Sequence, residues 1–357
     1  MSPQRVQPPP RRLLLQILAG LVLPMLVAGC QEPEVQVGPS VAPVANPYPA
    51  SDPIEQQIAA LKGARVGTWY APADYFSSAG YFHAGMTDVL QAETRGSAVA
   101  LLKPIIAQGT TALPHLFVHL QDSQKTYLYI EHRGDFGVMS WAGDYDVGPS
   151  GPREKLVDPE IDSPRRHVIT IGDLCFFAIG QIVNREFDTV RWVPTACIDL
   201  SSPTTIPALA ARVAKDWSGL TPEAHRESLL ADFRNGRESQ AILRLAFYYP
   251  QTAEPLALEG LKRPINSGNA REQAEFIQSL SPLRSNEVDA QVYRIFHNIG
   301  DDHLDELWKQ NDLAVACMER LIGKGHDAEF AAYCAAYAPP DEAGDDLRDI
   351  RRRLRKR

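Results

Sequence analysis

Two histidines four residues apart, His115 and His119, have the types and spacing to hold a metal ion. On a helix, side chains at i and i+4 lie on one face, where two imidazoles could bind one ion. The surrounding stretch HLFVHL, His115 to Leu120, instead alternates along its length, which favours a strand. On a strand the two rings lie ~13 Å apart and cannot share an ion. We therefore expect no metal site at this pair.

Two acidic segments carry oxygen and imidazole groups without the spacing of a known metal site. The segment FHNIGDDHLDE, Phe296 to Glu306, lies between two predicted helices, where acidic residues are typical caps. The segment DYDVG, Asp144 to Gly148, resembles the start of a calcium loop but lacks the downstream bidentate glutamate. We expect neither a metal nor a cofactor at these segments.

The chain lacks the short motifs that mark common catalytic sites. It contains no G-x-S-x-G, S-x-x-K, H-E-x-x-H, P-loop or G-x-G-x-x-G sequence. A hydrolase is the alternative hypothesis, and its candidate residues are His132, Asp135, Asp144 and Asp146. Their spacing assembles no nucleophile, base and orienting group, so a non-catalytic protein is the favoured interpretation.

Six aromatic residues gather in the fifteen residues between Trp69 and His83. They are Trp69, Tyr70, Tyr75, Phe76, Tyr81 and Phe82. Exposed aromatic faces on a loop stack against glycan or peptide ligands. We favour the simpler interpretation that these rings cover the sheet of the same domain.

Cysteines after Cys30 form an even set of four: Cys175, Cys197, Cys317 and Cys334. Cys317 and Cys334 lie on two apolar helical stripes at nearly equal distance from the break GKGH, Gly323 to His326, and would face each other in a helical hairpin. In an exported protein two disulfides are expected, Cys317 with Cys334 and Cys175 with Cys197. The alternative is a set of buried free thiols.

The first 30 residues have the layout of an export signal. Arg5, Arg11 and Arg12 form a basic front, an apolar run extends from Leu13 to Ala28, and Cys30 follows small residues. The run contains Gln16 and Pro24 and is shorter than the ~20 apolar residues of a membrane-spanning helix. We therefore expect residues 1–29 to be removed.

The motif Val27-Ala28-Gly29-Cys30 resembles the lipobox of bacterial lipoproteins. The resemblance implies that a diacylglyceryl group modifies the Cys30 thiol, that the chain is cut before Cys30, and that the new amino terminus is acylated. Two or three acyl chains would hold the protein on a membrane. Gln31 at the next position implies the outer membrane, with the protein facing the periplasm. Membrane lipid is thus the first expected partner.

Residues 30–53 form the predicted tether. Six prolines and few large apolar residues favour an extended, water-solvated chain. The whole chain carries a net charge of −8, and removal of three arginines would bring it to about −11. So acidic a body would repel phosphate backbones, which excludes nucleic acid as the main partner. An envelope protein or a glycan remains as the partner class.

The predicted fold class is an α+β domain over residues 54–203, followed by an all-α domain over residues 204–340. Alternating stretches at Thr126 to His132, Phe136 to Trp141 and His167 to Ile171 predict an antiparallel meander. Helical stripes flank it at Ser97 to Gln108 and Asp173 to Asn184. The hydroxyl- and proline-rich stretch SSPTTIP, Ser201 to Pro207, marks the expected boundary.

Beyond residue 205 the sequence predicts successive short helices with tight breaks. Thr221-Pro222-Glu223 is a helix start. Two apolar stripes follow: Ile242, Leu245, Ala246 and Tyr249, then Val288, Val292, Ile295, Phe296 and Ile299. Residues 205–338 are similar in architecture to HEAT-like helical repeats, without a fixed period. Such surfaces commonly bind other proteins.

Residues 341–357 end in the basic run RDIRRRLRKR. A solvated, frayed terminus is the favoured interpretation. The alternative is an electrostatic contact with an anionic surface.

Overall fold

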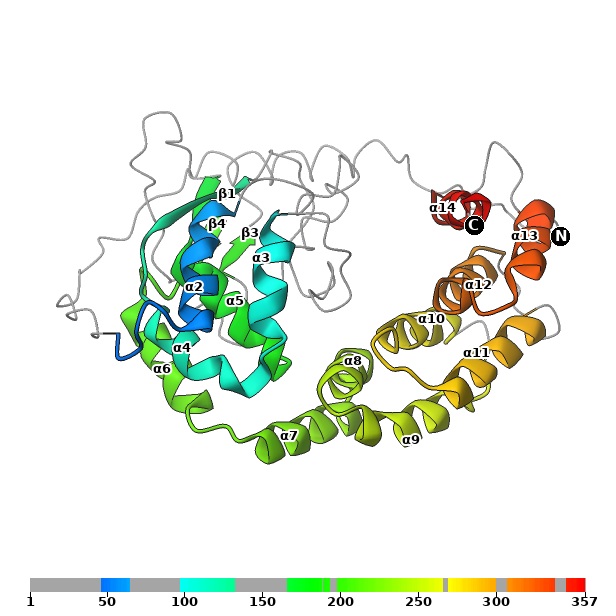
Figure 1. Cartoon of the computed structure of the whole chain (residues 1–357), viewed down its shortest axis with the longest axis horizontal. Helices are drawn as coiled ribbons and strands as arrows, with labels where there is room; N and C mark the ends of the chain where they lie inside the picture. Colours follow the sequence, from blue (N-terminus) through cyan, green and yellow to red (C-terminus); the bar gives the residue numbers. More distant parts are fainter. Residues whose placement is uncertain are drawn as a thin grey trace, which may run out of the picture.

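The computed structural model describes residues 46–64, 97–131, 166–187, 189–192, 198–265, 269–299, 307–337 and 345–356. Within these ranges the chain is mostly helical, with two small antiparallel sheets of two strands each (Figure 1). The predicted mixture of helices and antiparallel strands is therefore confirmed in outline. Helices make up more of the first half than the sequence predicted, and the stretch Phe136 to Trp141 lies outside the described residues.

The first half combines short helices with both sheets. Its elements are α2 (Pro53–Ala60), η1 (Leu61–Gly63), α3 (Ser97–Ile106), η3 (Gly109–Thr111), α4 (Leu113–Val118), β1 (Lys125–Glu131), β2 (Arg166–Thr170), α5 (Ile171–Val183), β3 (Val190–Trp192), β4 (Ile198–Leu200) and α6 (Pro207–Trp217). Strand β1 pairs with β2, with Tyr129 opposite Val168, and β3 pairs with β4. The strands predicted at 126–132 and 167–171 are confirmed by β1 and β2, except that Ile171 begins α5 and His132 lies outside the described residues. The helices predicted at Ser97 to Gln108 and Asp173 to Asn184 are confirmed by α3 and α5.

Helix α5 is the centre of the first core. A reciprocal capping box starts it: the Thr170 hydroxyl accepts from the Asp173 N–H at 3.1 Å, and the Asp173 carboxylate accepts from the Thr170 N–H at 2.9 Å. Nearly all of its residues are buried, and Asn184 ends it in the left-handed conformation with φ 60°. Helices α3 and α4 and strand β2 pack against it.

The strand predicted at His115 to Leu120 is wrong, because this stretch forms helix α4 and the turn after it. Pro114 lies in the first turn, where its fixed backbone favours a helix start. Leu116 and Leu120, four residues apart, are both buried in the first core. An alternation of only six residues fits either period, and here tertiary packing selected the helix.

The second half consists of helices alone among its described residues. They are α7 (Pro222–Arg234), α8 (Glu238–Tyr248), α9 (Pro250–Leu261), α10 (Ala270–Ser279), α11 (Asn286–Asn298), α12 (Leu307–Leu321), α13 (Asp327–Tyr337) and α14 (Asp345–Arg355). Helices α8, α10 and α12 pack in sequence along one layer, and α9 packs against α11 in the other. The helices curve away from the first half in an arc (Figure 1).

Local sequence signals fix several of these helices. Thr221 caps α7, and its hydroxyl accepts from the Ala224 N–H at 3.2 Å, which confirms the predicted start. The stripes predicted on α8 and α11 face the second core: Ile242, Leu245, Val288 and Val292 are all fully buried.

The boundary between the two cores differs from the predicted position at residues 203 and 204. The first core includes Leu209, Ala210 and Val213 of α6, and the second begins at Leu229 of α7. Within the predicted boundary, the buried Ser202 donates a hydrogen bond to Asp173 at 2.6 Å. The SSPTTIP stretch is therefore part of the first half, because its hydroxyl groups satisfy buried polar atoms rather than face water.

The predicted basic tail also differs from expectation, because residues 345–355 form helix α14, which packs on α12 and α13. Leu347 and Ile350 are buried in the second core, and Arg351 donates to the Cys334 carbonyl oxygen at 2.5 Å. Leu347 and Ile350, three residues apart, form the apolar face of this helix, and the high charge of the neighbouring residues hid that pattern in the sequence. In the part of the chain that the structure describes, no helix is long and apolar enough to cross a membrane.

Candidate functional site: a polar cavity on helix α11

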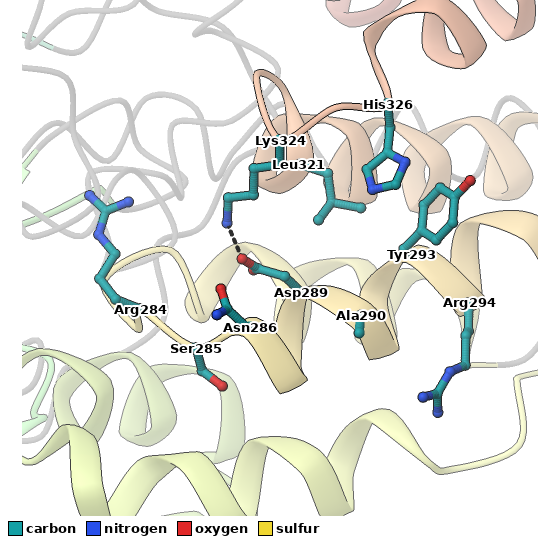
Figure 2. A pocket seen from close by; sticks show the side chains of 10 residues that line it. All are labelled: Arg284, Ser285, Asn286, Asp289, Ala290, Tyr293, Arg294, Leu321, Lys324 and His326. Atoms are coloured by element: carbon teal, nitrogen blue, oxygen red, sulfur yellow. Dashed lines mark hydrogen bonds and ion pairs between the residues drawn. The ribbon is translucent and has the colours of Figure 1, made fainter.

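An open cavity of about 760 Å³ lies between α11 and the turn that joins α12 to α13 (Figure 2). Sites for small ligands and peptide side chains are usually of this size. Most of its lining residues carry polar or charged groups, and their carbon atoms contribute much of the exposed wall. The lining residues are Arg284, Ser285, Asn286, Asp289, Ala290, Tyr293, Arg294, Leu321, Lys324 and His326.

The amphipathic pattern of α11 positions one wall of the cavity. Ser285 caps the helix by accepting from the Val288 N–H at 3.2 Å. Residues at a spacing of four, Ser285, Asp289 and Tyr293, then line the cavity. The apolar face of α11, which includes Val292, is buried in the second core, and this burial fixes the rotation of the helix about its axis.

The turn after α12 forms the opposite wall. Gly323 and Gly325 adopt positive φ angles of 81° and 101°, a conformation that glycine tolerates best. The Gly323 N–H donates to the Asp327 carboxylate at 2.7 Å, which secures the turn at the start of α13. Lys324 and His326 are thereby held over α11. The predicted break GKGH is thus confirmed, and it supplies two cavity residues.

Asp289 is the electrostatic centre of the cavity. Its carboxylate makes ion pairs with Arg320, at 3.0 Å, and with Lys324. Burial lowers the pKa of Arg320, and the attraction of Asp289 opposes this effect. Arg320 also donates to the carbonyl oxygens of Leu280 and Leu283, at 2.5 and 3.0 Å, so it anchors α12 to the residues before α11. Asp289 is therefore engaged in holding the two walls together.

Two exposed arginines lie at opposite ends of the cavity, Arg284 before the start of α11 and Arg294 in its last turns (Figure 2). The Arg294 guanidinium donates to the Gln291 side chain at 2.8 Å. With Lys324 these arginines give the lining three cationic groups and one carboxylate. An anionic ligand is therefore the chemistry that the lining fits.

Tyr293 and His326 form a ring stack across the cavity, with centroids 3.7 Å apart. The Tyr293 hydroxyl donates to Glu329 at 2.8 Å, and this hydrogen bond raises the pKa of the tyrosine. His297 contacts the same glutamate at 3.2 Å. The tyrosine thus stays neutral, and its hydroxyl is engaged in joining α11 to α13.

No family model, curated protein or solved structure matches this chain.

A second polar cluster surrounds Glu55 in the first half, and it corrects the predicted separation of His115 and His119. Each histidine contacts one oxygen of the Glu55 carboxylate at 2.8 Å, the first through Nδ1 and the second through Nε2. The helical turn of α4 therefore brings the two rings to one group. Even so, no set of three or more metal-ligating side chains is arranged for an ion among the residues that the structure describes.

Protonation of His119 fits its position between two carboxylates. Asp122 lies 3.5 Å from Nδ1, and its hydrogen bond raises the His119 pKa, as does the bond to Glu55, while burial opposes them. Burial would raise the pKa of Glu55, but hydrogen bonds from His119, His115 and Asn46 outweigh it and lower that pKa. Both shifts favour the charged forms, an imidazolium at His119 paired with the carboxylates of Glu55 and Asp122.

The Glu55 cluster also fixes the end of the predicted tether, which differs from the solvated chain expected up to Pro53. The Asn46 side chain donates to Glu55 at 2.7 Å, and the Tyr48 ring stacks on His115 with centroids 3.8 Å apart. Asp52 caps α2 by accepting from the Ile54 N–H at 2.8 Å. Asn46 and Tyr48 therefore attach this end of the predicted tether to the domain, while most of residues 46–52 are exposed. Because both Glu55 oxygens are used in this packing, the cluster is structural.

Ser202, Asp173 and His167 have the residue types of a catalytic triad, but their hydrogen bonds connect them in the wrong order. The Ser202 hydroxyl donates to Asp173 at 2.6 Å, and the His167 Nε2 contacts the other oxygen of that carboxylate at 3.0 Å. A nucleophilic serine must instead donate to the imidazole. All three residues are buried, so the group acts as a polar support for the start of α5.

Most sequence-predicted site residues lie outside the described ranges. They are Cys30, Cys197, the six aromatic residues Trp69, Tyr70, Tyr75, Phe76, Tyr81 and Phe82, and the hydrolase candidates His132, Asp135, Asp144 and Asp146. Cys317 and Cys334 are free and buried rather than joined as predicted, and Cys175, whose predicted partner Cys197 lies outside the described residues, is also free and buried. Burial raises the pKa of each of these thiols, so they pack as small apolar side chains.

The cavity residues were missed by sequence reasoning. The apolar stripe of α11 was predicted from the sequence, but the polar stripe of Ser285, Asp289 and Tyr293 on another face of the same helix was not. A spacing of four shared by a hydroxyl, a carboxylate and a phenol was the available signal. Its partners on α12 and α13 are more than 30 residues away, so no local pattern linked them.

Proposed function

We propose that this protein is a membrane-anchored envelope lipoprotein that binds a partner through its helical half and carries out no catalysis. The observation that carries the proposal is the cationic cavity on α11. The Ser285 hydroxyl donates to Glu254 of α9, and the Asp289 carboxylate and the Tyr293 phenol contact Arg320 and Glu329, so these groups are engaged in holding α11 to its neighbours. The exposed arginines at its two ends are available for ion pairs with a ligand. This chemistry supports binding.

The helical half, in this proposal, is a HEAT-like repeat unit. Two-layer packing supports the idea, since α8, α10 and α12 follow one another in one layer and α9 and α11 in the other. Stacked helix pairs of this kind expose an extended surface that suits polypeptide partners. Helix α14 covers the end of the stack with Leu347 and Ile350, as a terminal capping helix would.

Acylation of Cys30 anchors the protein to the outer membrane on its periplasmic side. The lipobox resemblance and the short apolar run support this part of the proposal. Replacement of Cys30 with serine should release the protein from the membrane fraction or leave it unprocessed, and should abolish metabolic labelling with palmitate. An unlabelled wild-type protein with unchanged fractionation of Cys30→Ser would refute the anchor.

Chemical crosslinking in intact cells, followed by peptide mapping, tests which half binds. We expect the crosslinked peptides of this chain to fall within residues 205–338. Crosslinks concentrated at residues 69–83, or hydrolytic activity in the isolated first half, would instead favour a functional site in the first half.

A further inference from the structure

We infer that the α11 cavity binds an extended acidic segment of a partner polypeptide, whose carboxylates pair with Arg284 at one end and Arg294 at the other. This inference rests on the proposed function and names the partner class for the same site. It begins from the positions of the two arginines at opposite ends of the lining (Figure 2).

The separation of the cationic groups indicates the length of the ligand. Arg284 and Arg294 are ten positions apart along α11 and the residues before it, which corresponds to roughly 15 Å of helix rise. The two guanidinium groups also point in different directions (Figure 2), so a single phosphate or carboxylate does not pair with both in this arrangement. An extended peptide covers this distance with about four or five residues. Acidic side chains at that spacing would meet both arginines.

The middle of the cavity fits the stretch between the two acidic residues. Lys324 shares the Asp289 carboxylate with the largely buried Arg320, so its ammonium group has capacity for a second acceptor. Ala290 and Leu321 add small apolar surfaces beside it. The Asn286 side chain can hydrogen-bond a peptide group.

An acidic glycan fits the same charges less well. Sugar rings bind proteins chiefly by stacking on open aromatic faces. Here His326 covers one face of the Tyr293 ring at 3.7 Å, and His297 contacts that ring at a steep angle with centroids 4.5 Å apart. Ion pairs with carboxylates on a flexible chain are therefore the better match.

Fluorescence anisotropy with the full acylated chain in detergent tests the inference. The probe is a decapeptide with a neutral fluorophore and glutamates at its third and seventh positions, which lie on the same face of an extended chain. The matched probe has glutamine at both positions. We expect the acidic peptide to bind at least about tenfold more tightly than its glutamine counterpart, with an affinity that falls as salt is added.

Matched variants assign the binding to the cavity. The double variant Arg284→Gln/Arg294→Gln should weaken binding by about tenfold or more. The control Arg226→Gln/Arg271→Gln removes two exposed arginines from α7 and α10, away from the cavity, and should leave binding unchanged. Equal binding of both peptides, equal loss in both double variants, or tighter binding of an oligogalacturonate would overturn the inference.

Failure of this inference differs from failure of the proposed function. If no acidic peptide binds while crosslinks in cells still map to residues 205–338, the ligand class is wrong and the helical half is still the binding half. Crosslinks that map outside residues 205–338 would contradict the proposed function itself.

Discussion

His225 on α7 contacts the carbonyl oxygen of Ile182 on α5 through Nε2 at 2.8 Å, and this contact joins the two halves of the molecule. The Ile182 carbonyl can only accept, so Nε2 carries the proton. Nδ1 faces the Tyr249 hydroxyl at 3.0 Å. Arg244 makes a parallel contact to the Gln181 carbonyl oxygen at 2.5 Å. The last turn of α5 is thereby held by side chains from the helical half.

Acid should weaken this junction. His225 is buried, and burial lowers its pKa below the usual value, so the native state holds it neutral. In the unfolded chain His225 binds a proton below about pH 6.5. Unfolding therefore takes up a proton in acid, and the free energy of unfolding falls as the pH falls through that range.

His225→Phe measures the contribution of the junction. The variant leaves the Ile182 carbonyl without its donor and should lose about 1–3 kcal/mol near neutral pH. Urea unfolding at about pH 7.5 and about pH 5.5 should show a smaller difference from wild type in acid, because the wild type then pays the protonation cost. A difference that grows in acid would contradict this account.

His119 should have the opposite pH dependence. Its pKa is raised by Asp122 and Glu55, so the native state holds the proton more tightly than the unfolded chain. The stabilisation is complete below about pH 6.5 and is lost as the pH rises through the higher native pKa. His119→Gln should cost about 0.5–1.5 kcal/mol in acid and less at about pH 8.5.

Urea unfolding of His119→Gln and wild type at both pH values checks this prediction. Arg271→Gln is a matched control, because its ion pair with Glu275 is exposed on α10 and should contribute almost nothing. A cost of His119→Gln that is larger in base than in acid would show that the imidazole is neutral in the native state.

Gly260 on α9 allows a close approach of α10. A methyl group there would lie 2.5 Å from the Phe276 ring, which is itself buried in the second core. Gly260→Ala should therefore destabilise the protein by about 1–3 kcal/mol through overpacking. Gly63→Ala is the control, because a methyl group at Gly63 meets no atom within 4 Å. Thermal unfolding of both variants makes the comparison, and equal melting temperatures would show that α9 and α10 separate without cost.

The first half should fold alone only when α6 is included. Leu209 and Val213 of α6 are buried among residues of the first core. A fragment of residues 46–219 should therefore unfold cooperatively, whereas residues 46–203 would expose that surface and should not. Circular dichroism during urea titration distinguishes them. Cooperative unfolding of the shorter fragment would restore the boundary expected from the sequence.

Sequence reasoning succeeded where the deciding signal is local. The cap and proline at Thr221 and Pro222 define the start of α7, and the stripe on α11 predicts its buried face. It failed where distant contacts decide. The short alternation at His115 to Leu120 predicted a strand, but packing on α5 favours a helix there. The charges of residues 348–357 predicted a solvated terminus, but most of these residues belong to a helix that packs on the second core.

The candidate site shows the same division. The glycine-rich break before His326 was visible in the sequence, and it became one wall of the cavity. The polar face of α11 is recognisable as part of a cavity only through its contacts with Arg320, Lys324 and Glu329, which lie on or between other helices. Glu55 was missed for a similar reason, since its partners His115 and His119 are about 60 residues away along the chain.

Site-specific photocrosslinking in intact cells tests the central claim most directly. A photoreactive residue replaces the exposed Ala290 inside the cavity or, as the control, Tyr127 in the first half, which is 63% exposed. The account predicts a discrete polypeptide adduct from position 290 that is lost in the Arg284→Gln/Arg294→Gln background, and none from position 127. An adduct from position 127 with none from position 290 would contradict it.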